Sequence, residues 1–324
     1  MNSFGIWAKY KEGIEDKQAV DVHANLWDIG KNSDSAFIDF GLMIPDYKNL
    51  EAITIALPFS VPDGCIKDLS DIICEKKIGS LVFNTVCVAH FGGRAGLYET
   101  KTLSLDNSDR HILLLPIADN SNYYGIIVKI EDVEGLTCIK IDFSGLRKEF
   151  EDYEKLYLRF RVRDSQIKDA MFCKLKKKNY FLESAFTETK IVDFMVNELR
   201  SIKTEVNEKM TNQKLELVEL SKVHFFVMEP AEREVSSDKM ECRRLEPGWD
   251  KYIEESYEPD TLVYHWSKKA KDDKNLSNYS ELVKVTSAET NWRLIWGYVF
   301  VGIALSVIAN ILHAKLVNIF PILK

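Results

Sequence analysis

The sequence predicts an α+β protein: a β-rich cytoplasmic body, formed by an antiparallel sheet or sandwich with a few helices, followed by a single C-terminal transmembrane helix. Three observations predict this class. Short β-rich runs separated by turn residues follow one another through the first half of the chain. Only 15 glycines and 8 prolines occur among 324 residues, and 46% of the residues are hydrophobic, which excludes collagen-like and disordered classes. An uncharged apolar run lies close to the carboxyl end.

The predicted strands are most evident before residue 165. They are expected at 36–44, 52–59, 111–117, 123–131, 136–143 and 156–164, with a further strand at 222–229. The first two are separated by Pro45-Asp46 and a short polar stretch, which predicts a hairpin. Residues 187–202 are predicted as a helix because Thr187 can cap it, Arg200 suits its last turn, and apolar residues recur at helical spacing.

These elements predict five consecutive regions. They are a β-rich cytoplasmic domain at 1–150, a mixed α/β cytoplasmic region at 151–266, a polar linker at 267–291, the transmembrane helix at 292–314 and a short tail at 315–324. The six cysteines show no CxxC motif and no regular spacing, so reduced thiols in a cytoplasmic body are expected rather than a disulfide framework.

Charge is unevenly distributed along the chain, whose formal net charge is -7. The charged residues of the segment 291–324 are Arg293, Lys315 and Lys324, so every acidic residue of the chain precedes this segment. An acidic body argues against a generic polyanion-binding protein. A basic, otherwise uncharged end is typical of a segment that meets a membrane.

The uncharged run is the segment 294–312, LIWGYVFVGIALSVIANIL. As a helix it would extend about 28 Å, close to the hydrocarbon thickness of a bilayer. Aromatic and basic residues at its ends suit the headgroup region: Trp292, Arg293, Trp296 and Tyr298 at the entry, and His313 and Lys315 at the exit. A buried core helix needs no such ends. Because the amino terminus lacks an apolar signal segment and only a short stretch follows Leu312, we expect a single-pass inner-membrane protein with its bulk in the cytoplasm.

One face of this helix is less apolar than the rest. Tyr298, Gly302, Ser306 and Asn310 follow at steps of four and therefore share a face. Gly302 and Ser306 form a small-xxx-small pair, which permits close helix approach, and an amide facing lipid would lack hydrogen-bond partners. Two interpretations stay open: a simple anchor with Asn310 near the interface, or a homo-oligomer such as a tetramer, whose helices could surround a water-filled path.

Basic residues form a second candidate site. Arg159, Arg161 and Arg163 alternate along a predicted strand, so their guanidiniums would line one face at a repeat of about 7 Å, similar to the spacing of phosphates in an extended nucleic acid. The further basic and aromatic candidates follow: Lys174, Lys176, Lys177, Lys178 and Tyr180. Basic and aromatic side chains together are typical of single-strand binding grooves, which favours a nucleotide or oligonucleotide ligand. The alternative is a solvated sheet face with acidic partners.

No catalytic motif is evident. The histidines form no HExxH or HxxxH pair, the Gly92–Gly96 turn lacks a phosphate-loop GK[ST], and no GxSxG occurs. His224, in an apolar run, is predicted to be a satisfied core histidine. We therefore expect no enzyme activity, no catalytic residues, no metal and no cofactor, although an active site assembled from distant residues would leave no such motif.

Three short motifs carry a resemblance: LPFS at 57–60, IKDL at 66–69 and LVFN at 81–84. Together with the predicted layout, they resemble membrane effectors of bacterial anti-phage operons, in particular the channel-like membrane partner of the nucleotidyltransferase-dependent Hailong system. The resemblance implies an oligomeric channel, held inactive by a single-stranded DNA oligomer that its nucleotidyltransferase partner makes. Opening would depolarise the membrane. A passive anchor that docks a soluble partner at the membrane is the alternative.

Overall fold

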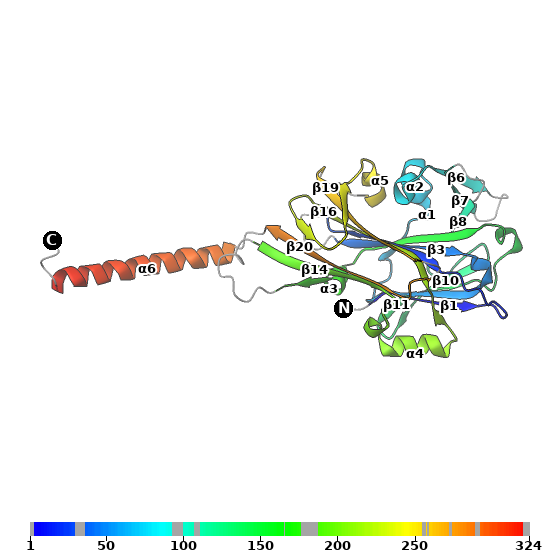
Figure 1. Ribbon diagram of the computed structural model, residues 1–324, viewed down its shortest axis with the longest axis horizontal. Helices are drawn as coiled ribbons and strands as arrows, with labels where there is room; N and C mark the ends of the chain where they lie inside the picture. The colour runs from blue at the N-terminus through cyan, green and yellow to red at the C-terminus, as the bar shows by residue number, and fades with distance from the viewer. Residues whose placement is uncertain are drawn as a thin grey trace.

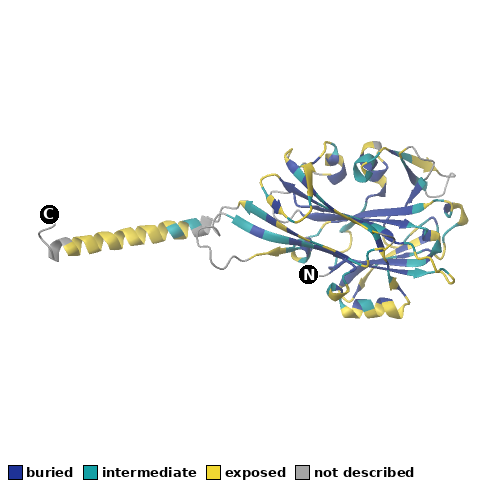
Figure 2. Cartoon of the chain, in the orientation of Figure 1, coloured by how far each residue is buried: buried dark blue, intermediate teal, exposed yellow. Residues whose placement is uncertain are grey.

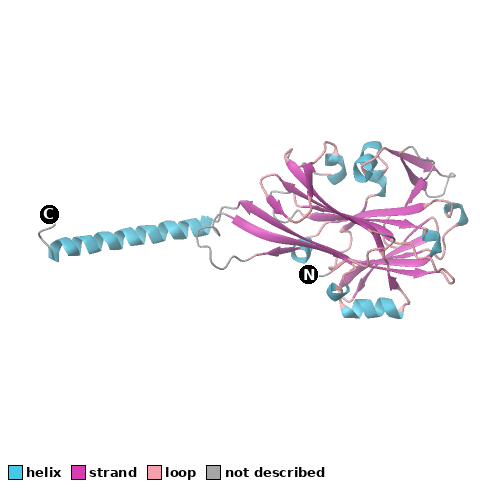
Figure 3. Cartoon of the chain, viewed as in Figure 1, coloured by secondary structure: helices cyan, strands magenta, loops and turns pink. Residues whose placement is uncertain are grey.

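The computed structural model describes residues 3–29, 36–92, 100–106, 111–164, 166–175, 187–254, 257, 259–271, 274–288 and 292–319. Strands make up 48% of the chain and helices 23%. The predicted fold class is confirmed: a β-rich body carries one long apolar helix at the carboxyl end, and this helix projects away from the body (Figures 1 and 3).

A six-stranded sheet forms the lower layer of the body in Figure 1. All of its neighbouring strands are antiparallel. In spatial order they are β15 (Glu216–Leu217), β1 (Gly5–Tyr10), β4 (Leu50–Ala56), β11 (Leu136–Asp142), β10 (Ile126–Val133) and β9 (Ser121–Tyr123).

A ten-stranded sheet lies above it. In order its strands are β18 (Glu241–Arg244), β19 (Thr261–Lys269), β16 (Leu220–Pro230), β2 (Val20–Trp27), β3 (Phe37–Pro45), β12 (Lys155–Val162), β8 (His111–Leu114), β7 (Thr100–Leu105) and β6 (Cys87–Gly92), while β5 (Ile66–Asp68) also pairs with β12. The pairs β16–β2 and β12–β8 are parallel, so the sheet is mixed.

The main core lies between the two sheets. Alternate residues of the central strands, such as Val22 and Leu26 of β2 and Ile53 and Ile55 of β4, are completely buried in one cluster. Phe4, just before β1, stacks on Phe40 of β3 at 5.1 Å between ring centroids. Burial of these apolar side chains holds the two sheets face to face.

Both outer faces of this sandwich are covered by helices. Helix α4 (Thr204–Asn212) buries Val206 and Met210 against the outer face of the six-stranded sheet. The outer face of the ten-stranded sheet is covered by α1 (Ser70–Ile73), α2 (Lys76–Phe83) and α5 (Trp249–Ile253), with a second apolar cluster beneath them. Both faces of the ten-stranded sheet are therefore shielded over its central strands.

A four-stranded sheet leads from the sandwich toward the C-terminal helix. It contains β13 (Phe172–Lys174), β14 (Thr187–Val196), β20 (Tyr279–Ala288) and β17 (Glu234–Ser236), and α3 (Gln166–Met171) precedes it. Strand β14 pairs with β20 along its whole length. Phe194 of β14 stacks on Phe225 of β16 at 4.4 Å, which joins this sheet to the main core.

The predicted helix at 187–202 is wrong. Residues 187–196 form β14, and only Leu199–Ser201 make a single 3₁₀ turn. Val192, Phe194 and Val196 alternate toward the core, and β-branched residues favour this extended conformation. Hydrogen bonding to β20 along the whole strand favours the extended conformation over the helix that the spacing of the apolar residues predicts.

Other boundaries also differ from the prediction. Strands β3 and β4 form where expected but pair in different sheets, so they are not a hairpin: the 3₁₀ turn η1 (Tyr47–Asn49) carries the chain from one sheet to the other. The ten-stranded sheet takes strands from both sides of residue 150. Within the predicted linker at 267–291, residues 279–288 form β20.

The C-terminal helix α6 (Trp292–Ile319) has 28 residues and is therefore about 42 Å long. Its segment Ile295–Leu316 has a mean hydropathy of 2.1 and is 0% buried against the rest of the chain. Figure 2 shows that the helix is exposed over most of its length, and its exposed apolar residues include Phe300, Ile303 and Leu305. The segment is long and apolar enough to cross a membrane, as the sequence predicts.

Candidate functional site

The three arginines predicted to form an exposed row do not form one. Arg159 and Arg161 of β12 are each 2% exposed, because α5 covers the sheet face to which they point. Arg163, just after β12, is exposed and lies with its guanidinium 4.6 Å from the ring centroid of Phe37. The prediction of a phosphate-gripping row and the alternative of a solvated face are both wrong for Arg159 and Arg161.

The remaining basic candidates are only partly described. Lys174 ends β13, is exposed and pairs with Glu188 at 2.8 Å. Lys176, Lys177, Lys178 and Tyr180 lie outside the described residues. The arginine strand and the lysine segment are thus not brought together into one exposed groove among the residues that the structure describes.

Arg161 has a complete set of partners. Its Nε and Nη2 donate to the two oxygens of Asp39 at 2.7 and 3.1 Å, and its Nη1 donates to the carbonyls of Tyr252 and Ile253 in α5. Trp27 Nε1 donates to the same carboxylate at 2.9 Å. The nearby Asp39 raises the pKa of Arg161, although burial opposes this shift. The bidentate pair joins β12 to β3, and the two bonds from Nη1 anchor α5 to the sheet.

Arg159 is less completely satisfied. Its Nε donates to the Tyr252 hydroxyl at 2.7 Å and its Nη1 to the Tyr157 hydroxyl at 3.0 Å. Its Nη2 is buried without a hydrogen-bond partner among the described residues. The side chains of Arg159 and Tyr157 both lie over Gly41 of β3. A Cβ added at Gly41 would come within 2.4 Å of the Tyr157 hydroxyl oxygen. A side chain at position 41 would therefore displace this arrangement.

A cavity of about 450 Å³ lies beside Arg159, between the outer face of β2, β16, β19 and β18 and the covering helices α2 and α5. Its size falls in the range of about 300–1,000 Å³ typical of small-molecule sites. Its apolar lining includes Trp27, Phe83, Phe226, Met228 and Trp249. The motif LVFN at 81–84 contributes all four of its residues to the lining.

Three histidines on neighbouring strands line the same cavity. His224 of β16 and His265 of β19 share a hydrogen bond of 2.9 Å between Nδ1 and Nε2, and His23 of β2 lies opposite His224 in the parallel register. His23 Nδ1 is 3.4 Å from the Tyr157 hydroxyl, which in turn accepts from Arg159. These contacts form a continuous polar row across the sheet. His224 is satisfied as predicted, but it faces a cavity rather than the core.

All three imidazoles are uncharged at neutral pH. Burial lowers the pKa of His23 well below its usual value and that of His224 to about 4, with neighbouring cationic groups adding to the effect. Burial also lowers the pKa of His265, against the opposing effect of Glu241. Neutral rings can donate or accept hydrogen bonds and stack on aromatic groups. No set of three or more side chains placed to hold a metal ion occurs in the part of the chain that the structure describes.

This histidine row predicts a loss of stability in acid. In the unfolded chain the histidines bind protons below about pH 6.5, whereas in the folded chain they resist protonation, so the unfolded state gains protons first as pH falls. The contribution of the neutral histidines to the free energy of unfolding is fully present above about pH 6.5. It is lost as the pH falls toward the pKa of the folded state, which is about 4 for His224. We expect the melting temperature to fall between pH 7 and pH 5, and to fall less in His224→Gln. His313→Gln is the control, and an identical pH dependence in both variants would contradict the interpretation.

A buried ionic cluster lies on the other side of the same strand ends. Asp28, just after β2, and Glu229, near the end of β16, are both nearly inaccessible. Arg233 pairs with Asp28 at 2.9 Å and also with Glu229, and Lys190 of β14 pairs with Glu229 at 3.2 Å and with Asp28. Burial and the adjacent Asp28 raise the pKa of Glu229 to about 7, although both cations oppose the shift. The cluster fastens the four-stranded sheet to the ten-stranded sheet.

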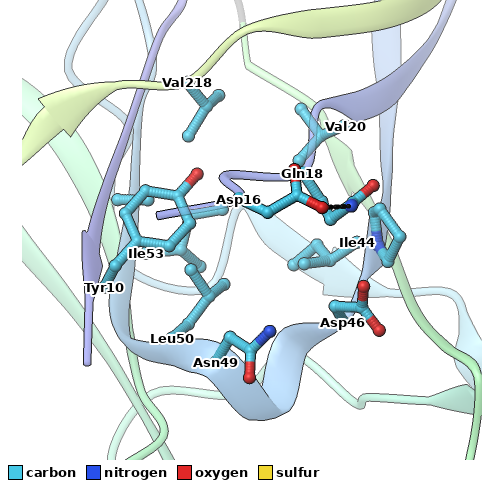
Figure 4. Close-up of a pocket in the computed structure, with 12 residues that line it drawn as sticks. Tyr10, Asp16, Gln18, Val20, Ile44, Asp46, Asn49, Leu50, Ile53 and Val218 are labelled. Atoms are coloured by element: carbon cyan, nitrogen blue, oxygen red, sulfur yellow. Dashed lines mark hydrogen bonds between the residues drawn. The ribbon is translucent and has the colours of Figure 1, made fainter. Parts of the chain in front are cut away.

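A second hollow is too small for a ligand. It lies beside Tyr10, Leu50 and Ile53, where Gln18 donates to Asp16 at 3.1 Å (Figure 4). Its volume is about 10 Å³, which is room for no more than about one water molecule. The cavity beside Arg159 is therefore the better candidate site.

Sequence reasoning missed this cavity, although a signal was present. In residues 20–27, VDVHANLW, apolar residues alternate toward the core, which places His23, Asn25 and Trp27 together on the other face. The same alternation in β16 places His224 and Phe226 on one face.

No protein-family model matches the chain, and no curated protein matches it in a sequence search.

Proposed function

We propose that this protein is a single-pass membrane effector whose copies associate through the polar face of α6. In this proposal the body lies in the cytoplasm and binds a ligand that controls how the membrane helices pack. Opening a water-filled path between the helices depolarises the membrane. The resemblance noted from the three short motifs makes anti-phage defence the setting of this activity.

One observation carries the proposal: among the residues that the structure describes, no other part of the chain covers the polar face of α6 at Gly302, Ser306 and Asn310. Gly302, Ser306 and Asn310 are all exposed, and nothing lies within 4 Å of a Cβ placed at Gly302. In a bilayer the Asn310 amide needs a hydrogen-bond partner, and a helix from a second copy presents the same face. Association of copies satisfies the amide and brings the two small residues into close contact.

A connected set of contacts leads from the candidate cavity toward this helix. Trp27 and Met228 line the cavity, and the next residues along their strands are Asp28 and Glu229 of the ionic cluster. Lys190 joins those carboxylates to β14, which pairs along its length with β20. Strand β20 ends at Ala288, and α6 begins at Trp292. A shift of these strand ends on ligand binding would therefore reach the start of the membrane helix.

Membrane potential in bacteria tests the proposal against a passive anchor. Expression of the full chain is expected to lower the signal of a voltage-sensitive dye under activating conditions such as phage infection. Exchange of residues 295–316 for an unrelated Leu/Ala span of equal length should abolish the response, because the polar face is removed while membrane attachment is kept. If the exchanged protein still depolarises the cell, or the native one never does, the effector proposal is wrong.

A further inference from the structure

We propose that the cavity between β2, β16, β19, α2 and α5 binds a small planar aromatic molecule that carries one anionic group, with the anion at Arg159 and the ring against the aromatic wall. This inference concerns binding by the body and holds whether or not α6 forms a pore. It does not involve the exposed nucleic-acid groove that the sequence predicts.

The anionic group is required by Arg159. The side chain is 2% exposed and borders the cavity, and two of its nitrogens donate only to tyrosine hydroxyls. Its Nη2 has no partner among the described residues, and Asp39, the carboxylate whose charge acts on Arg159, already accepts from Nε and Nη2 of Arg161. A buried positive charge that has no direct carboxylate partner among the described residues favours an anion where Arg159 borders the cavity.

The aromatic lining favours a planar ring. On the sheet side, Phe226 and His265 stack at 4.2 Å with an interplanar angle of 7°, and His224 lies within 18° of the plane of His265. Phe83 of α2 and Trp249 of α5 contribute aromatic surface from the covering segments. A flat ring between these surfaces gains stacking contacts, and the neutral imidazoles can hydrogen-bond to its ring heteroatoms.

The rest of the lining limits the ligand to a single anionic group. Arg243 and Glu246 pair with each other at 3.3 Å, and both are about half exposed. Asp21 lies opposite Lys222 in the strand register, which offsets its charge locally. Glu241 adds an exposed carboxylate at the border. Arg159 is therefore the single buried cation of the described lining, and acidic groups near the mouth disfavour polyphosphates.

Calorimetric titration of the detergent-purified full chain tests the inference. The probes are benzoate, indole-3-acetate and 2-naphthoate, which share a flat ring and one carboxylate but differ in size. Indole-3-ethanol lacks the charge, cyclohexylacetate lacks the flat ring, and ATP carries several charges. We expect at least one aromatic carboxylate to bind about 10- to 100-fold more tightly than each of these controls.

Two variants locate the binding. Arg159→Gln should remove the preference for the charged probe, and Val82→Trp should block the cavity from the partly exposed surface of α2 without touching the arginine. Val86→Trp, exposed and outside the lining, is the matched control and should bind as the native chain does. The inference is overturned if no aromatic carboxylate binds, if the uncharged or non-planar probe binds equally well, or if Val82→Trp leaves binding unchanged. These outcomes are independent of the membrane-potential result.

Discussion

Replacement of Gly302 by leucine is expected to separate the copies of the protein in the membrane. Gly302 and Ser306 lie one turn apart on the open face of α6, and close approach of two helices there depends on small side chains. In the proposed association, leucine at 302 would add bulk at the contact and move Asn310 away from its counterpart. Loss of about 1–2 kcal/mol of helix association corresponds to a roughly 5- to 30-fold weaker assembly.

Ala304→Leu provides the matched control. Position 304 lies about 200° around the helix from position 302, so a similar increase in apolar bulk would face lipid instead of the proposed partner. Crosslinking in native membranes through a single cysteine introduced at 299 would measure the association of each variant. Equal crosslinking of Gly302→Leu and Ala304→Leu would show that this face does not join the copies.

Replacement of Asp39 by alanine is expected to unfold much of the body. Asp39 accepts two hydrogen bonds from Arg161 and one from Trp27, and all three side chains are buried. Its removal leaves the buried guanidinium of Arg161 without its carboxylate. Breaking a buried pair in this way costs about 3–5 kcal/mol, a large part of the stability of a typical domain.

Urea unfolding followed by tryptophan fluorescence measures this loss. Asp71→Ala is the control, because Asp71 pairs with Lys101 while its own side chain is 79% exposed, and such pairs contribute about 1 kcal/mol or less. Asp39→Asn should fall between the two variants, since the amide can still accept from Trp27 but no longer carries charge. A loss in Asp39→Ala no larger than that in Asp71→Ala would mean that the arginines are not held as described.

Local patterns were sufficient for several strands, such as β3, β4, β11, β12 and β16, and for the apolar helix α6. Alternation in β12 correctly placed Leu158, Phe160 and Val162 on one face and the arginines on the other. The apolar run in α6 is long enough that no distant contact alters its interpretation. Both features depend on neighbours within one element, so the sequence of that element carries them.

Whether a face of the sheet is exposed or covered depends on elements that are distant in the sequence. Arginine alternation on β12 indicates a solvent-facing surface unless another element covers it, and here α5 does so from a distant part of the sequence. The cavity likewise joins His23 to His224 and His265, from strands that are neighbours in the sheet but lie near opposite ends of the body's sequence. The helix predicted at 187–202 is wrong for the same reason, because pairing with the distant strand β20 determines the conformation of this segment.

The mass of the full-length protein in lipid nanodiscs tests the central claim most directly. If the exposed polar face of α6 requires other copies, each particle should contain two or more chains, and extraction from membranes should require detergent. Particles with one chain each, or a full-length protein that stays dissolved in buffer without detergent, would contradict the account.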